Sequence, residues 1–213
     1  MNINNITNLQ KFKGKFIAIE GIDGSGKSTQ SKLLAAHFTK LGLNVTLTRE
    51  PGGTDKAEIL RNVILNNKFA NITEMLLFQA ARYEHVANLI KPQLQQDYLI
   101  ICDRFIDSTF VYQGLNGVDQ ELINTIHQLT SKILPDLTIL MDADISLCQE
   151  RLSNRKDNNY YDELKFDQLK IIKEHFHHLA HNSKKHIVIR VDHNDEMLIH
   201  QAIIKNVINF FDK

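Results

Sequence analysis

At residues 21–29 the sequence reads Gly21-Ile22-Asp23-Gly24-Ser25-Gly26-Lys27-Ser28-Thr29, directly after an apolar run at residues 16–20. Its first eight residues match the pattern G-x-x-x-x-G-K-[ST], and a helical pattern follows. Glycines let such a loop curl so that several backbone N–H groups point at phosphate oxygens, and the helix start adds the positive end of its dipole. The stretch therefore predicts a phosphate-binding loop for a nucleotide, between a strand and a helix.

Two side chains of this loop suit the chemistry of a nucleoside triphosphate. Lys27 can reach the β- and γ-phosphates, and the hydroxyl of Ser28 can bind Mg²⁺. The alternative is a glycine-rich turn that binds nothing, but the strand before the loop and the helix after it favour the nucleotide site. The motif by itself leaves the reaction open.

Short apolar runs rich in β-branched residues alternate with segments of helical spacing along the chain. Runs that are apolar on both faces are typical of strands covered on both sides. The expected strands are residues 16–20, 44–48, 98–102, 137–141 and 186–191, and the expected helices are 31–41, 56–65, 73–94, 120–134, 164–180 and 196–211. This alternation predicts an α/β fold with a mainly parallel sheet, and the absence of a linker predicts one domain over residues 1–213.

The composition argues against several classes of protein. Among 213 residues, 25 Lys and Arg balance 25 Asp and Glu, whereas non-specific nucleic-acid binding needs a basic surface. Cys102 and Cys148 lie in or beside apolar runs, as buried free thiols do. The first residues lack the apolar stretch of a secretory signal, and no run approaches the roughly 20 apolar residues of a membrane span. We expect a cytoplasmic protein without nucleic-acid or membrane partners.

Two charged residues follow the apolar run at 99–102. Asp103 can hold Mg²⁺ through water, opposite Ser28. Arg104 would face the phosphate site, where its planar fork suits phosphoryl oxygens. The alternative for Asp103 is a helix N-cap, which the adjoining Arg104 makes less attractive.

A second arginine, Arg49, ends another strand, at the carboxyl edge of the sheet where ligands bind in open α/β folds. Arg49 and Arg104, in addition to Lys27, imply a second phosphorylated group. A GTPase or a simple ATPase does not need such a group, but a kinase that acts on a nucleoside monophosphate does.

Three further segments sharpen this interpretation, namely Arg49-Glu-Pro-Gly-Gly-Thr54, Asp103-Arg-Phe105 and Tyr112-Gln-Gly114. Together with the phosphate-binding loop, they resemble the bacterial thymidylate kinases, over nearly the whole chain from about residue 16. The resemblance implies a P-loop kinase fold with a short mobile lid. It also implies a homodimer that uses ATP and Mg²⁺ to convert dTMP to dTDP for dTTP synthesis.

The resemblance implies roles for individual residues. Those matching the family's acceptor site are Asp23, Arg49, Phe78, Arg82, Arg104, Ser108 and Gln113. Arg49 and Arg104 would hold the dTMP phosphate, and Asp23 would contact the sugar 3′-hydroxyl. Phe78 would stack on thymine and Arg82 would hydrogen-bond it, while Ser108 and Gln113 would line the same pocket.

Phe78 and Arg82 also stand four residues apart in the helix expected at 73–94, so they project from one helical face. Phe78 offers a flat apolar ring, and Arg82 offers a planar guanidinium whose N–H donors have fixed directions. From the residues alone, the alternative is that Phe78 belongs to the core and Arg82 is a solvated surface residue.

The polar, aperiodic segment at about residues 151–163 is the expected lid. Arg151 and Arg155 match arginines of the family, and Tyr160 takes the place of a further one. With Lys27, Asp103 and Arg104, these two arginines complete the expected catalytic set. We expect Arg155 to contact the transferred phosphoryl group, and Arg151 to lie on the short helix before the lid.

Other interpretations remain to be tested. One is a kinase for a different nucleotide or nucleoside. Another is a regulatory GTP-binding switch, which should carry Asn-Lys-x-Asp, whereas the chain has Asn67-Lys68-Phe69-Ala70. A histidine cluster could place two or three imidazoles on one helical face, as in a metal site, but a solvated helix face is favoured; its members are His175, His177, His178 and His181.

Overall fold

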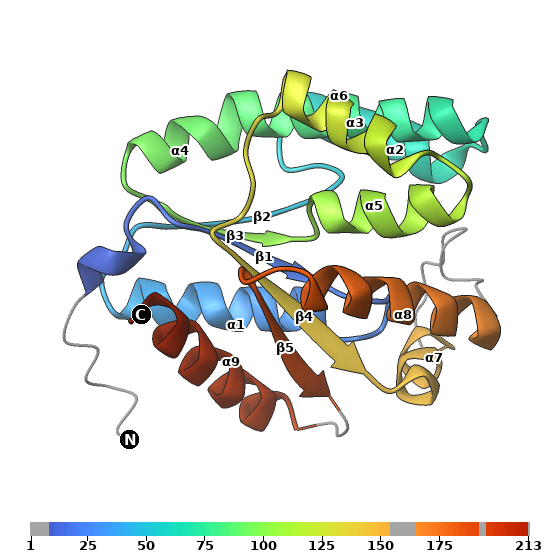
Figure 1. Ribbon diagram of the computed structural model, residues 1–213. Coiled ribbons are helices and arrows are strands. Elements are labelled where there is room, and N and C mark those ends of the chain that lie inside the picture. Colours follow the sequence, from blue (N-terminus) through green and yellow to red (C-terminus); the bar gives the residue numbers. More distant parts are fainter. Residues whose placement is uncertain (1–8, 154–164, 192–194, 213) are drawn as a thin grey trace.

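The computed structural model describes residues 9–153, 165–191 and 195–212. Its centre is a five-stranded parallel sheet in the order β2-β3-β1-β4-β5 (Figure 1). The strands are β1 (Phe16–Glu20), β2 (Val45–Arg49), β3 (Leu99–Asp103), β4 (Leu137–Ala143) and β5 (His186–Val191). The predicted α/β fold is confirmed. Two strands lie one residue later than predicted, so that Arg49 and Asp103 are themselves the last residues of their strands.

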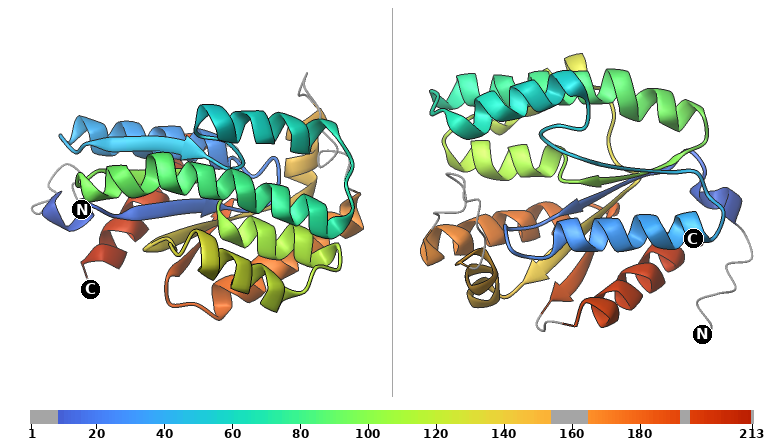
Figure 2. Two further views of the ribbon diagram at one scale, coloured as in Figure 1. Left: turned by 90° about the horizontal axis from the view of Figure 1, so that it is seen from above. Right: turned by 180° about the vertical axis from the view of Figure 1, so that it is seen from behind.

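Helices cover both faces of the sheet (Figures 1 and 2). On one face, α1 (Lys27–Lys40) packs beside α9 (Glu196–Phe211). The other face carries α3 (Asn71–His85), α5 (Ile106–Leu115), α6 (Gln120–Thr130) and α8 (Phe166–His181), and α2 (Asp55–Asn66) packs against α3. Two further short helices are η1 (Leu9–Phe12) before β1 and α7 (Ile145–Ser153) after β4. None of the helices in the described ranges is long and apolar enough to cross a membrane.

The helix predicted over residues 73–94 changes its geometry near the end. It forms α3, then the π-helical turn η2 (Val86–Ile90), then α4 (Lys91–Gln95). The N–H of Lys91 bonds to the carbonyl of Val86, five residues back, and Pro92 follows at the start of α4. Because proline has no N–H and its ring clashes with the preceding turn, the wider π turn accommodates it without ending the helix.

The three central strands β1, β3 and β4 are buried on both faces, as predicted, whereas the edge strands expose Leu47 of β2 and Val188 of β5. Ile17 and Ile19 join the cluster that includes Leu34 of α1, whereas Phe16 and Ala18 join the cluster that includes Met75 of α3. Cys102 and Cys148 are free and buried, also as predicted. Since the body of the sheet is apolar, its charged side chains gather where the strands end.

Candidate active site

The phosphate-binding loop joins β1 to α1 in a conformation that requires glycine. Gly24 has a φ of 82°, and a Cβ there would lie 2.5 Å from the carbonyl oxygen of Cys148. Gly21 has a φ of 140°, and its Cβ would lie 2.7 Å from the carbonyl oxygen of Met141. The loop is thus pressed against β4 and α7, where no side chain would fit.

Lys27 lies at the first turn of α1 and is 5% exposed. Its Nζ donates to the Ile22 carbonyl at 2.8 Å and lies 3.7 Å from the carboxylate of Asp23. Burial and the charge of Arg104 lower the pKa of Lys27. The ammonium group therefore sits inside the loop, without a close ion pair, where phosphate oxygens would satisfy it.

Ser28 and Asp103 meet across the carboxyl edge of the sheet. The hydroxyl of Ser28 donates to Oδ2 of Asp103, and the other carboxylate oxygen, Oδ1, is buried with no hydrogen-bond partner among the described residues. A hydroxyl beside a carboxylate with an unused oxygen is a set of hard oxygen donors, which fits Mg²⁺. The N-cap of α5 is Phe105, so the alternative of Asp103 as a helix cap is wrong.

Arg104 adopts a left-handed backbone conformation, with a φ of 69°. Its Nη2 donates to Asp23 at 2.7 Å and its Nη1 to the hydroxyl of Ser108 at 2.8 Å. Burial would lower the pKa of Arg104, but Asp23 and neighbouring groups hold it well above the ordinary value. The guanidinium is therefore fixed, charged and directed to the space beside the phosphate-binding loop.

Glu20 supports this arginine from the end of β1. Its carboxylate accepts from the N–H of Phe105 at 2.7 Å and from the hydroxyl of Ser108 at 2.6 Å. Burial, with the nearby charge of Asp107, raises the pKa of Glu20 to about 7. Ser108 thus connects a buried carboxylate to the Arg104 guanidinium.

Arg49 ends β2 directly beside Asp103 of β3, so the predicted meeting of neighbouring strand ends is confirmed. Its side chain is 54% exposed and pairs with Glu58 at 3.1 Å. Glu58 also accepts the N–H of Gly53 at 3.0 Å, which ties the residue 50–54 loop to α2. Arg49 is more loosely held than Arg104.

Phe78 and Arg82 come from one face of α3, as predicted, but they lie at different depths. Phe78 lines the cavity described below and packs against the small cluster between α2 and α3. Arg82 is only 2% exposed, so the alternative of a solvated Arg82 is wrong. Its guanidinium lies behind the cavity wall, where it bonds to Glu50, Gln79 and Thr109.

One cavity of about 700 Å³ runs along the carboxyl edge of the sheet, a size suited to small ligands. Residues predicted from sequence that line it are Asp23, Gly24, Ser25, Gly26, Lys27, Ser28, Thr29, Arg49, Phe78, Asp103, Arg104, Ser108, Gln113 and Arg151. Gly21, Ile22 and Arg82 are not in its wall. Arg155 lies outside the described residues, as does most of the expected lid.

Several lining residues were given no role in the sequence analysis, among them Arg61, Thr109, Met141 and Glu196, and Glu50 and Tyr112 appeared there only as members of the quoted motifs. Arg61 donates to the Pro51 carbonyl at 2.7 Å, and burial together with the charge of Arg49 lowers its pKa. Tyr112 could have been found from α5, because it follows Ser108 by four residues and so lies on the same helical face. No local signal identifies Arg61 or Glu196.

Arg151 of α7 lies against the phosphate-binding loop, and its Nη1 donates to the Gly24 carbonyl at 3.0 Å. The guanidinium is therefore placed at the end of the cavity that the phosphate-binding loop forms.

Among the histidines of α8, His177 contacts Asp142 at 3.0 Å. No group of three metal-binding side chains is found in the described parts of the chain.

Comparison with known proteins agrees with this geometry. A family model described as thymidylate kinase matches residues 19–203. A thymidylate kinase of Wolbachia pipientis subsp. Culex pipiens (strain wPip) is 43% identical over 89% of this chain and 93% of its own. One of Rickettsia typhi (strain ATCC VR-144 / Wilmington) is 38% identical over 92% and 98%, respectively. The crystal structure of thymidylate kinase from Ehrlichia chaffeensis superposes with a TM-score of 0.76 at 35% identity, covering 91% of this chain and 98% of that one. The chain belongs to the thymidylate kinase family.

Proposed function

We propose that the protein transfers the γ-phosphoryl group of ATP to dTMP, with Mg²⁺ bound beside the phosphate-binding loop, and releases dTDP and ADP. The observation that carries this proposal is the continuous cavity with cationic groups along its length. Lys27 and Arg151 stand at the loop, and Arg49 stands at the end of β2. Arg104 stands between them, because its Nη2, at 2.7 Å, and the Nζ of Lys27, at 3.7 Å, both contact Oδ1 of Asp23. A donor and an acceptor phosphate that meet in one cavity need such a row of cations.

At the donor end, the backbone N–H groups of the loop would hold the ATP phosphates, and Lys27 would follow the charge that develops on the transferred group. Ser28 and Asp103 would hold Mg²⁺, which supplies positive charge to the phosphate oxygens when bound. The unpartnered Oδ1 of Asp103 supports this assignment.

At the acceptor end, Arg104 and Arg49 would hold the dTMP phosphate, and Asp23 would accept from the sugar 3′-hydroxyl. Phe78 would stack on thymine, while Thr109 and Gln113 lie in the same part of the wall. Arg82 would approach the base from behind this wall. Ser108 is engaged with Arg104 and Glu20, which favours a role in orienting the arginine over contact with the base.

For the transferred phosphoryl group we propose a lid arginine. Arg155 is the first candidate, as its place in the sequence predicts. The contact of Arg151 with the loop carbonyl of Gly24 gives it a place within reach of the same phosphate. Comparing variants of Arg155 and Arg151 tells which of them contacts the transferred phosphoryl group.

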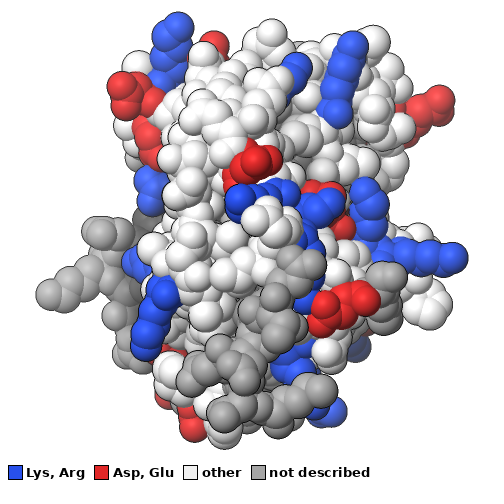
Figure 3. Space-filling model, turned by 90° about the vertical axis from the view of Figure 1, so that its left-hand side faces the viewer, with Lys and Arg blue, Asp and Glu red and all other residues white. Residues whose placement is uncertain are grey.

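The cellular location and the assembly are also proposals. We propose a cytoplasmic homodimer that binds neither nucleic acid nor membrane. In keeping with the zero net charge, Figure 3 shows basic and acidic side chains interspersed over one face of the molecule. An exposed apolar group on α2 and α3 is a suitable dimer surface; it comprises Ile59, Val63, Ile72 and Leu76.

An acceptor panel tests the proposed activity. With ATP and Mg²⁺, formation of ADP is measured with dTMP, dUMP, dCMP and thymidine at equal concentrations. We expect dTMP to react much faster than dCMP or thymidine. Turnover of dCMP at the rate of dTMP would contradict the base assignment, and the absence of dTMP turnover would contradict the proposed activity as a whole.

A further inference from the structure

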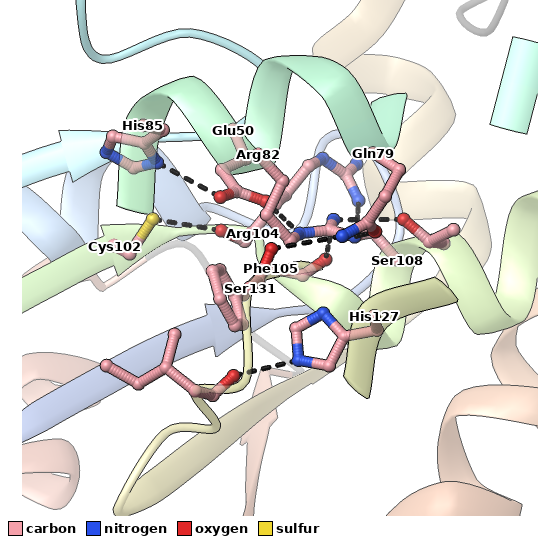
Figure 4. Close-up of polar contacts among 12 residues, drawn as sticks. Glu50, Gln79, Arg82, His85, Cys102, Arg104, Phe105, Ser108, His127 and Ser131 are labelled. Carbon is pink, nitrogen blue, oxygen red and sulfur yellow. Dashed lines mark hydrogen bonds and ion pairs between the residues drawn. The ribbon is translucent and has the colours of Figure 1, made fainter. Parts of the chain in front are cut away.

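A buried polar cluster connects the residue after β2 to α3 (Figure 4). At its centre is Glu50, which is 5% exposed. One carboxylate oxygen, Oε2, accepts from Nε of Arg82 at 2.7 Å, and the other, Oε1, lies 3.0 Å from Nδ1 of His85. Both oxygens therefore face α3, although Glu50 itself forms part of the cavity wall.

Glu50 fixes a guanidinium that is otherwise surrounded by neutral groups. Nη1 of Arg82 donates to Gln79 at 3.2 Å, and its Nη2 donates to the Phe105 carbonyl at 3.2 Å and to the hydroxyl of Thr109 at 2.9 Å. With the bond to Glu50, four of its five N–H groups are used. One N–H on Nη1 has no bond to the described residues, and its direction is set by the other four bonds. Because Arg82 lies behind the cavity wall rather than in it, a base must press into the wall to accept from this N–H.

The carboxylate is the charged partner in this arrangement. Burial would raise the pKa of Glu50, but Arg82 and His85 outweigh burial and lower the pKa below the ordinary value. A buried ion pair with several hydrogen bonds is costly to break, because either partner alone is left without compensation. The orientation of Arg82 therefore depends on the negative charge of Glu50.

His85 connects this pair to the loop that follows β2. The ring is fully buried, and its Nε2 lies 2.7 Å from the hydroxyl of Thr48. A Cβ on Gly53 would lie 2.5 Å from Nε2 of His85. The loop that follows Arg49 is therefore packed against the same imidazole ring that contacts the Glu50 carboxylate.

We propose that Glu50 is a positioning residue for recognition of the acceptor base, and that it acts through Arg82. Its carboxylate aims the free N–H of Arg82 at a carbonyl oxygen of the pyrimidine, and His85 keeps the carboxylate in place. The inference rests on the proposed function, because it assigns this arginine to the base of dTMP. It assigns no contact between Glu50 and the reacting groups.

The first test is Glu50→Gln, which keeps the shape of the side chain but removes its charge. We expect KM for dTMP to rise about tenfold or more, because a charge-assisted hydrogen bond is lost. KM for ATP and kcat at saturation should stay within about twofold to threefold, since the donor end is untouched. An unchanged KM for dTMP overturns the inference.

Asp142→Asn is a matched control. Asp142 is a less deeply buried carboxylate near the end of β4, and it pairs with Lys173 at 2.7 Å and with His177 at 3.0 Å. It does not line the main cavity. The control should leave KM for dTMP unchanged. An equal rise in both variants would mean that loss of any buried carboxylate loosens the protein, and it would overturn the specific role of Glu50.

A base-free probe separates positioning from a general disturbance of the loop. Deoxyribose 5-phosphate can occupy the phosphate and sugar positions but offers no base to Arg82. Its inhibition constant against dTMP should be the same in the wild type and in Glu50→Gln. A parallel rise in the inhibition constant of the probe and in KM for dTMP would show that the loop after Arg49 has moved. That result would overturn the proposed action through Arg82.

His85→Gln keeps the inference testable if Glu50→Gln does not fold. The glutamine can retain the contact with Thr48 and loses the contact with Glu50. We expect a smaller rise in KM for dTMP, about threefold, with KM for ATP unchanged. No change in KM for dTMP overturns the inference. Turnover of dTMP by the wild type tests the proposed function separately, so the two failures are distinguishable.

Discussion

The two ends of the cavity are built in different ways. The donor end is one continuous stretch at residues 21–29, with Asp103 as its main distant partner. The acceptor end is assembled from β2, α3 and the turn between β3 and α5. Buried Glu50 holds Arg82, half-buried Asp23 of the loop holds Arg104, and the exposed Arg49 pairs with Glu58. The donor end therefore depends on local backbone geometry, and the acceptor end depends on tertiary packing. Substitutions at the two ends should differ in which substrate they affect.

The largest expected effect is at the lid arginines. Arg155→Ala should lower kcat by about 10³-fold, because arginines that contact the transferred group supply roughly 10³–10⁵ in related chemistry. The affinity for dTMP should be nearly unchanged. The measurement is kcat under saturating ATP and dTMP, beside Arg151→Ala. If Arg155→Ala leaves kcat unchanged and Arg151→Ala abolishes it, the catalytic arginine lies on α7, one helical turn earlier.

Lys27→Ala tests the donor end directly. The variant removes a buried ammonium group that faces the loop, so kcat should fall by on the order of 10²-fold or more. The fold should survive, since the ammonium group of Lys27 lies in the loop, beside the Ile22 carbonyl and the Asp23 carboxylate. Steady-state kinetics and circular dichroism check the two parts. Near-normal kcat in a folded variant would rule out this role for Lys27.

Phe78→Ala probes the acceptor end. Stacking on an aromatic ring is worth about 1–3 kcal/mol per base in other nucleic-acid sites, so KM for dTMP should rise roughly tenfold. KM for ATP should change little. Phe78 also packs between α2 and α3. A variant that binds both substrates poorly and has lost its cooperative unfolding would instead favour a purely structural role.

The last effect concerns Glu20 and appears in stability rather than in catalysis. Its pKa is about 7 in the folded protein against 4.5 ordinarily, so the folded state holds the proton more tightly. The resulting stabilisation is fully present below pH 4.5 and is lost as the pH rises through 7. It amounts to on the order of 3 kcal/mol. Glu20→Gln should therefore flatten the pH dependence of the unfolding free energy between these values, measured with urea. Parallel curves for the two proteins would contradict the raised pKa.

The difference between the two ends also explains what the sequence could predict. The strands, most helices and the loop at residues 21–29 follow from periodicity and from one contiguous motif. The spacing of Phe78 and Arg82 placed them on one helical face but could not indicate how deeply each is buried. The burial of Arg82 depends on Glu50 and Thr109, which are 32 and 27 residues away along the chain. The π turn before Pro92 depends on how a packed helix accommodates a missing N–H.

The central claim is that Arg49 and Arg104, at the ends of two neighbouring strands, recognise the acceptor phosphate. The most direct measurement is the ratio of kcat/KM for dTMP to that for thymidine, in the wild type and in Arg49→Ala. Arg49 is exposed, so the variant should fold. We expect a high ratio in the wild type and a fall of about 10²-fold in the variant, because only dTMP carries the phosphate that Arg49 binds. An unchanged ratio, with dTMP and thymidine affected alike, would contradict the account.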